Sequence, residues 1–133
     1  MILMDATPPK PPRKIGRYVL IALALIAVGG AGYVLLRNYP EEHAISRFLT
    51  TLEQGNFQEA YQLWQPSSTY SFGDFMHDWG QQGDYGKIRD FKILGSQSKG
   101  KASVIVVVSI NDQTPPAEIL VDRKTKGLAF SPY

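Results

Sequence analysis

The sequence contains no cysteine among its 133 residues, and its only histidines are His43 and His77. Disulfides, thiolate metal sites and cysteine nucleophiles are therefore excluded, and no histidine spacing typical of a metal site is present. The sequence also lacks a nucleophile elbow, a phosphate-binding loop and a dinucleotide-binding fingerprint. We therefore expect no catalytic residue, no metal and no cofactor, and hence a protein that is not an enzyme.

An excess of positive charge is lacking outside the N-terminal segment, although the formal net charge is +2. Residues 1–37 contain a single acid, Asp5, and most of the excess of basic residues, whereas residues 38–133 contain more acids than bases. A nucleic-acid-binding domain needs a basic surface of its own. We therefore expect no nucleic-acid partner.

A long apolar run covers residues 15–36, and no charged side chain interrupts it between Arg17 and Arg37. At a rise of ~1.5 Å per residue this stretch spans about 28 Å, close to the ~30 Å thickness of the hydrocarbon core of a bilayer. Tyr18 and Tyr33 lie near its two ends, where aromatic rings favour the headgroup region. The run predicts a transmembrane helix over residues 15–37 and makes the lipid bilayer the first expected partner.

The charges on either side of this run predict its orientation. Basic residues precede it in a proline-rich tail, residues 1–14, while Glu41 and Glu42 follow Arg37. The positive-inside rule then places the tail in the cytoplasm and residues 38–133 on the periplasmic, extracytoplasmic side of the inner (plasma) membrane. The alternative is a signal peptide cleaved near residues 29–31, but the apolar run continues beyond that point.

Residues 38–133 are predicted to form an α+β domain. Helical spacing of apolar residues, with Pro40 and Gly55 as start and stop signals, predicts three helices, in which Ser71 and Asp74 cap the last one and Asn56 and Glu59 resemble a capping pair. Alternating β-branched residues then predict an antiparallel meander packed under these helices. The apolar residues of the expected helices lie within 44–52, 57–64 and 72–79, and the expected strands cover 88–94, 102–110, 118–121 and 128–130.

The segment Gly55-Asn56-Phe57-Gln58-Glu59-Ala60-Tyr61, which follows an amphipathic helix, resembles a known opening motif. It is similar to the pattern Phe-x-x-x-Leu-x-x-Gly-Asp-Tyr-x-x-Ala-Tyr of small bacterial membrane-anchored NTF2-like (cystatin-like) envelope domains. The helix from Ser71 and the valine-rich strands follow in the same order, over residues 41–131. The resemblance implies a cone of helices on a four-stranded sheet with an N-terminal tether, and it implies no particular reaction or ligand.

Two groups of polar residues are candidates for chemistry inside or on this domain. Asp74, His77 and Asp78 share one helix face and could bind a metal ion, but a solvated face is the simpler interpretation. Asp90 interrupts an apolar strand, as the buried carboxylate of an isomerase would, with Tyr61, Tyr70 or Tyr85 as hydrogen-bond donors. Strand alternation places Asp90 beside Lys92, which argues against its burial.

Aromatic side chains concentrate between residues 57 and 91. At helical spacing such residues form either a packed core or the wall of a pocket for a small apolar ligand. The residues expected to line such a pocket are Tyr61, Trp64, Phe75 and Trp79.

Two apolar surfaces are predicted to bind another protein. Ala24, Ala27 and Ala31 form a small-residue stripe on which a second transmembrane helix could dock. In the sheet, Ile105, Val107 and Leu120 point away from the helix-covered face, so we expect a homodimer mate or another membrane-protein subunit to cover them.

Basic residues recur in the first and third turns of the predicted meander, which lie at the same end of an up-and-down sheet. They are either solvated turn residues or a contact for anionic headgroups or an acidic partner. This basic end consists of Lys99, Lys101, Arg123, Lys124 and Lys126. Taken together, the patterns predict a non-enzymatic interaction module, an accessory subunit or assembly factor of a larger membrane complex such as a respiratory or photosynthetic one; the alternative is a tethered protein that binds a ligand inside the cone.

Overall fold

The computed structural model describes residues 13–133, which form two compact units: the helix α1 and an α+β domain, Arg37–Tyr133. Helix α1 covers Arg13–Leu36, so it begins before the predicted residue 15 and ends one residue before the predicted residue 37. It is long and apolar enough to cross a membrane, which fits the predicted anchor and also a signal sequence. Most of the predicted cytoplasmic tail lies outside the described residues.

Three further helices precede the sheet. Helix α2, Tyr39–Glu53, has a proline in its first turn and Glu41 and Glu42 near its positive end, as predicted. Helix α3 covers Phe57–Trp64 and helix α4 covers Phe72–Trp79. The predicted capping box of Ser71 and Asp74 is formed in α4. Asn56 precedes α3 but does not cap its backbone, because its amide donates instead to the Glu59 carboxylate at 2.8 Å.

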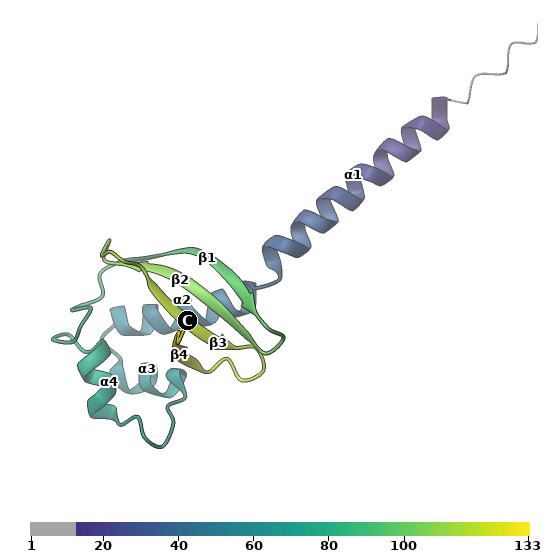
Figure 1. The fold of residues 1–133 in the computed structure, drawn as a ribbon. Helices are drawn as coiled ribbons and strands as arrows, with labels where there is room; N and C mark the ends of the chain where they lie inside the picture. Colours follow the sequence, from purple (N-terminus) through teal and green to yellow (C-terminus); the bar gives the residue numbers. More distant parts are fainter. Residues whose placement is uncertain (1–12) are drawn as a thin grey trace, which may run out of the picture. The chain divides into compact units, whose positions relative to one another are not determined.

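The four strands form one antiparallel sheet in the order β1-β2-β3-β4 (Figure 1). They cover Phe91–Lys99, Ser103–Ile110, Ala117–Asp122 and Leu128–Phe130. The predicted limits of β2, β3 and β4 agree with these within one residue. The prediction for β1 was wrong: the segment expected to be strand from residue 88 begins as a loop, and the segment expected to be a turn from residue 95 is strand as far as Lys99.

A bulge at Leu94 explains this difference. The pairing of β1 with β2 shifts between Ile93, which faces Val108, and Gly95, which faces Val107. The extra residue turns the second half of β1 over, so that Ser96 and Ser98 follow Phe91 and Ile93 on the same face of the sheet. The face of β1 under the helices therefore changes from apolar to polar along the strand.

The hydrophobic core lies between this face of the sheet and the helices. Helix α2 packs on β1, β2 and β3, and α3 packs on α4 and β4. In β2 the residues that point to the helices are almost completely inaccessible, with exposed fractions of 0–1% for Val104, Val106, Val108 and Ile110. The α+β class and the helix-covered face of β2 are therefore confirmed.

Candidate functional site

The space between the helices and the sheet is filled by aromatic rings. Phe48 of α2 lies at its centre, with its ring 5.1 Å from that of Trp79 and 5.3 Å from that of Trp64, and the two tryptophan rings are 5.7 Å apart. These centroid distances are those of rings in direct contact. The structure thus brings the predicted pocket residues together. Because their rings contact one another, they form a packed core and leave little room for a ligand.

The outer members of this cluster close the remaining gaps. The ring of Tyr61 lies 5.3 Å from that of Phe75, and its hydroxyl donates to the carbonyl of Tyr70 at 2.6 Å. Phe130 of β4 stacks on Trp79 with an interplanar angle of 4°. The indole Nε1 of Trp79 is buried and has no hydrogen-bond partner among the described residues.

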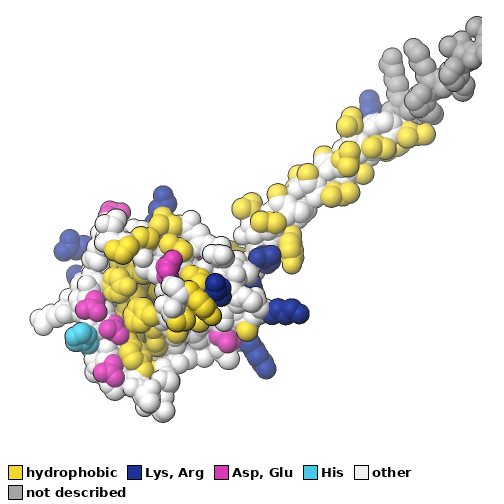
Figure 2. All heavy atoms as spheres, viewed as in Figure 1, with side chains coloured by type: hydrophobic (Ala, Val, Ile, Leu, Met, Phe, Trp, Pro, Cys, Tyr) yellow, Lys and Arg dark blue, Asp and Glu magenta, His cyan; other side chains and the backbone are white. Residues whose placement is uncertain are grey.

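The opposite, outer face of the sheet holds the predicted docking residues. Val107 and Leu120 are half-buried, and Ile105, which pairs with Leu120, is only 7% exposed. Leu94, raised by the bulge, is 53% exposed. Figure 2 shows hydrophobic side chains gathered on the surface of the domain that faces the viewer.

The chain's own C-terminal residues cover part of this outer face. Lys99 pairs with Ser103 at one edge of the sheet, and its ammonium lies 4.3 Å from the centre of the Tyr133 ring. Tyr133 follows β4, at the other edge, so the last residues cross the face of the sheet, and Figure 1 marks the C-terminus over its middle. This contact was not predicted.

The predicted alanine stripe lies on a continuous helix. Ala24, Ala27 and Ala31 all fall within α1, and their side chains are exposed. Residues spaced by three and seven positions share one face of a helix. Within α1 the three alanines therefore form one continuous face on which a second helix could dock.

The predicted basic end is formed, but two of its cations point inward. The backbone N–H of Arg123 donates to the Ala102 carbonyl at 2.9 Å, which places the first and third turns side by side. The guanidinium of Arg123 donates to the Glu41 carboxylate at 2.6 Å, and Lys126 lies 3.9 Å from the same carboxylate. Glu41 is only 2% exposed, so its carboxylate is removed from solvent, whereas the Arg123 and Lys126 side chains stay partly exposed.

The buried ion pair belongs to a larger polar network at the start of α2. Arg123 also donates to the Asn38 side chain and to the Ser98 hydroxyl, both at 2.9 Å. Arg37 donates to the same hydroxyl at 2.5 Å, and Ser96 donates to Glu42 at 2.9 Å. The network fixes Arg37 and Asn38, the two residues that follow α1, on the sheet, and the serines reach it because of the bulge.

The other three basic residues of this end stay at the surface. Lys101 and Lys124 are exposed, and Lys99 covers the ring of Tyr133. Lys124 lies in the turn held by Asp122, whose carboxylate accepts the backbone N–H groups of Lys124 and Thr125 at 2.9 and 2.8 Å. These two hydrogen bonds lower the pKa of Asp122.

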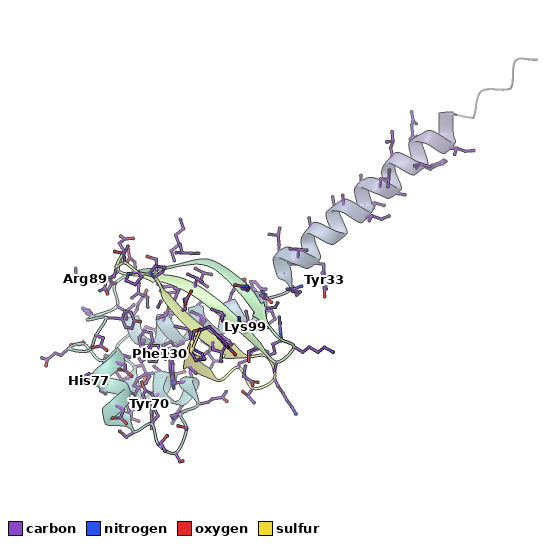
Figure 3. The ribbon with its side chains drawn as sticks, in the orientation of Figure 1. Tyr33, Tyr70, His77, Arg89, Lys99 and Phe130 are labelled. Atoms are coloured by element: carbon purple, nitrogen blue, oxygen red, sulfur yellow. The ribbon has the colours of Figure 1, made fainter. Side chains whose placement is uncertain are left out.

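The candidate metal ligands differ from the predicted set. Asp74 is engaged in the capping box, whereas ligand atoms of His77, Asp78 and Asp84 all lie within 4.8 Å of one another. Asp78 also accepts a hydrogen bond from the Tyr70 hydroxyl at 2.6 Å. Burial and this bond raise the pKa of Tyr70 above its ordinary range. These residues are at the surface (Figure 3 labels His77 and Tyr70), and nothing else in the described chain points to an ion there.

The predicted isomerase-type carboxylate is not in the core. Asp90 lies in the loop before β1 and is exposed, because the strand begins at Phe91 and not at residue 88. Its backbone N–H donates to the side chain of Asn111 at 3.2 Å. The expectation that strand alternation argues against the burial of Asp90 is therefore confirmed.

A groove that the sequence did not reveal lies beside the start of α2. It has a volume of about 560 Å³ and is bounded by the exposed side of α2, the end of α3 and the β3–β4 turn. No periodic pattern marks it, because its lining comes from three segments far apart in the chain.

Comparison of the chain with models of protein families, with curated proteins and with solved structures finds no match.

Proposed function

We propose that this protein is a single-pass membrane protein whose α+β domain is a non-enzymatic docking module, a small accessory subunit or assembly factor of a larger membrane complex. The observation that carries the proposal is the contrast between the two faces of the sheet. The inner face is filled by packed rings around Phe48, whereas on the outer face Val107 and Leu120 are only partly buried. A partner protein can therefore bind to the outer face of the sheet, whereas a ligand would find little space inside the domain.

The anchor supports the same proposal. Every large apolar side chain of α1 from Ile15 to Leu36 is exposed, and only a bilayer or another apolar partner stabilises such a surface. With the basic residues before it and Glu41 and Glu42 after it, we place the domain on the extracytoplasmic side. The order of three helices followed by a four-stranded meander supports a cone of the NTF2-like type.

The docking residues we propose are Val107 and Leu120, with Leu94 at the edge of the same sheet. Leu94 is 53% exposed and Val107 and Leu120 are only partly buried, and apolar residues left accessible together favour a protein contact. The strand β1 is also an open edge, which can pair with another chain. The bulge and Lys92 limit such pairing, so we assign the contact to the face of the sheet and not to its edge.

The test is the size of the particle that contains the full-length chain after extraction of its own membranes with a mild detergent. We expect a complex larger than the 14.8 kDa single chain. Val107→Asp places a charge in the contact and should release the chain, whereas the matched change Gln58→Asp, at an exposed position of α3, should not. A wild-type chain that runs alone contradicts the proposal.

A further inference from the structure

The groove beside α2 has a composition suited to an amphiphile. Its apolar lining includes Ala44 of α2 and Leu63 of α3, and the ring of Tyr39, which is 57% exposed, stacks on His43 at a centroid distance of 5.9 Å. Amphipathic aromatic side chains such as tyrosine, with an apolar ring and a polar group, favour the headgroup layer of a membrane. The groove thus combines an apolar floor with an amphipathic rim.

The charge of the groove is positive. Arg47 lines it and is exposed, and Lys126 borders it from the β3–β4 turn. No carboxylate is among the residues that line the groove in the described part of the chain. The ammonium of Lys126 is partly neutralised, because it lies 3.9 Å from Glu41 and donates to the Arg123 carbonyl. Arg47 is therefore the main group available to an anion.

The walls of the groove are held in place by the fold. The amide of Gln65, at the end of α3, donates to the Thr125 carbonyl in the β3–β4 turn at 2.6 Å. This bond joins two of the three segments that bound the groove, and the core residues of α2 fix the third. A preformed site loses less conformational entropy when a ligand binds.

The chain connection keeps one rim residue of the groove, Tyr39, close to the end of α1. Tyr39 follows the last residue of α1, Leu36, by three positions. Three residues span at most about 10 Å even when fully extended. The rim of the groove therefore lies within the reach of lipid headgroups if α1 crosses a bilayer.

We propose that this groove binds the headgroup of an anionic phospholipid of the same membrane. Arg47 pairs with the phosphate, a role suited to its planar guanidinium, while the glycerol and the first part of an acyl chain lie over Leu63, Ala44 and the Tyr39 ring. The proposal rests on the anchor in the proposed function and does not require the docking face. Such binding would attach the domain to the membrane at a second point, in addition to α1, and with a preference for one class of lipid.

Native mass spectrometry of the full-length chain tests this proposal. The delipidated protein is mixed with equal amounts of phosphatidylglycerol and phosphatidylcholine that carry the same acyl chains, and the bound lipids are counted. We expect preferential retention of phosphatidylglycerol. Arg47→Gln should lower this preference about fivefold, the effect of one cation near an anionic surface, and Arg47→Lys should keep most of it.

Two matched controls separate the groove from general charge attraction. Arg89→Gln removes an exposed arginine before β1 (Figure 3), and Lys124→Gln removes an exposed lysine of the basic end that does not line the groove. Both variants should keep the preference, and millimolar inorganic phosphate should not displace the lipid. The proposal is overturned if the wild type shows no preference, if Lys124→Gln loses as much as Arg47→Gln, or if inorganic phosphate displaces the lipid. None of these results affects the particle size, which tests the docking face separately.

Discussion

The residue that most constrains the start of the domain is Glu41, an acid with almost no exposed surface. A carboxylate leaves water at a large cost in free energy, and here the guanidinium of Arg123 compensates for that cost. The two residues are far apart in the sequence, on α2 and in the β3–β4 turn. Their pairing ties the beginning of the domain to its last hairpin.

Removing the cation should therefore be much more harmful than removing a neighbouring one. We expect Arg123→Ala to lower the free energy of unfolding by about 2 kcal/mol, because the buried Glu41 carboxylate loses a charged hydrogen bond and keeps only the more distant Lys126, 3.9 Å away, of its two cations. Lys124→Ala, one residue further along the exposed turn, should change it by less than about 0.5 kcal/mol. Urea unfolding of the full-length chain in detergent, followed by tryptophan fluorescence, measures both, since Trp64 and Trp79 lie only in the domain. Equal losses of unfolding free energy in the two variants would show that the pair of Arg123 and Glu41 does not stabilise the domain.

Asp122 gives the molecule a stability that depends on pH. Its pKa is lowered in the folded chain because its carboxylate accepts the backbone N–H groups of Thr125 and Lys124. The stabilisation is therefore fully present above the unfolded pKa of about 3.9 and is lost as the pH falls through the lower, folded value. Asp122→Asn keeps the oxygen acceptor but cannot titrate, so its urea midpoint should vary less between about pH 5 and pH 2 than that of the wild type. An unchanged pH profile would contradict this role.

At the scale of elements, α2 holds the domain together through one aromatic side chain. Phe48 is completely buried, and its ring contacts those of Trp64, Phe75 and Trp79. The helix therefore packs on both neighbouring helices, α3 and α4, through the same residue. Its loss leaves a cavity at the centre of the cluster.

We expect Phe48→Ala to cost about 3–5 kcal/mol of unfolding free energy, the range for a large aromatic core residue. Thr50→Ala, at an exposed position of the same helix, should be close to neutral. The comparison uses the same urea titration. If Phe48→Ala unfolds at the wild-type midpoint, the rings do not fill the space under the sheet, and a ligand site inside the domain becomes the better hypothesis.

The elements also show what the sequence could reveal. β2 contains a continuous run of valine and isoleucine, so its limits followed from β-branched composition. β1 was misplaced because a bulge at Leu94 has no period of its own, and the polar run Gly95–Lys99 has the composition of a turn. The capping box of α4 was visible from the spacing of Ser71 and Asp74.

Sites formed by segments far apart in the chain could not be predicted from local sequence patterns. Glu41 appeared only as a favourable charge at a helix N-terminus, since nothing local indicates that Arg123 reaches it. The groove at Arg47 and the contact between Lys99 and Tyr133 depend equally on tertiary packing. Sequence patterns predict the elements well and their long-range polar partners poorly.

At the scale of the whole molecule, the absence of cysteine makes the proposed orientation easy to test. Ser68→Cys introduces a thiol at an exposed loop of the domain, and Ala6→Cys introduces one in the N-terminal segment. In intact cells, a membrane-impermeant maleimide should label the first variant and should label the second only after permeabilisation. The reverse pattern would place the domain in the cytoplasm, and loss of the N-terminal segment from the mature protein would identify α1 as a signal sequence.

The central claim is that the outer face of the sheet contacts another membrane protein. A photocrosslinking amino acid at position 107, activated in intact membranes before any extraction, tests it most directly. The account predicts one specific crosslinked product from position 107 and none from position 58, an exposed position of α3. No product from position 107, or the same products from both positions, would contradict the claim that this face is a docking surface.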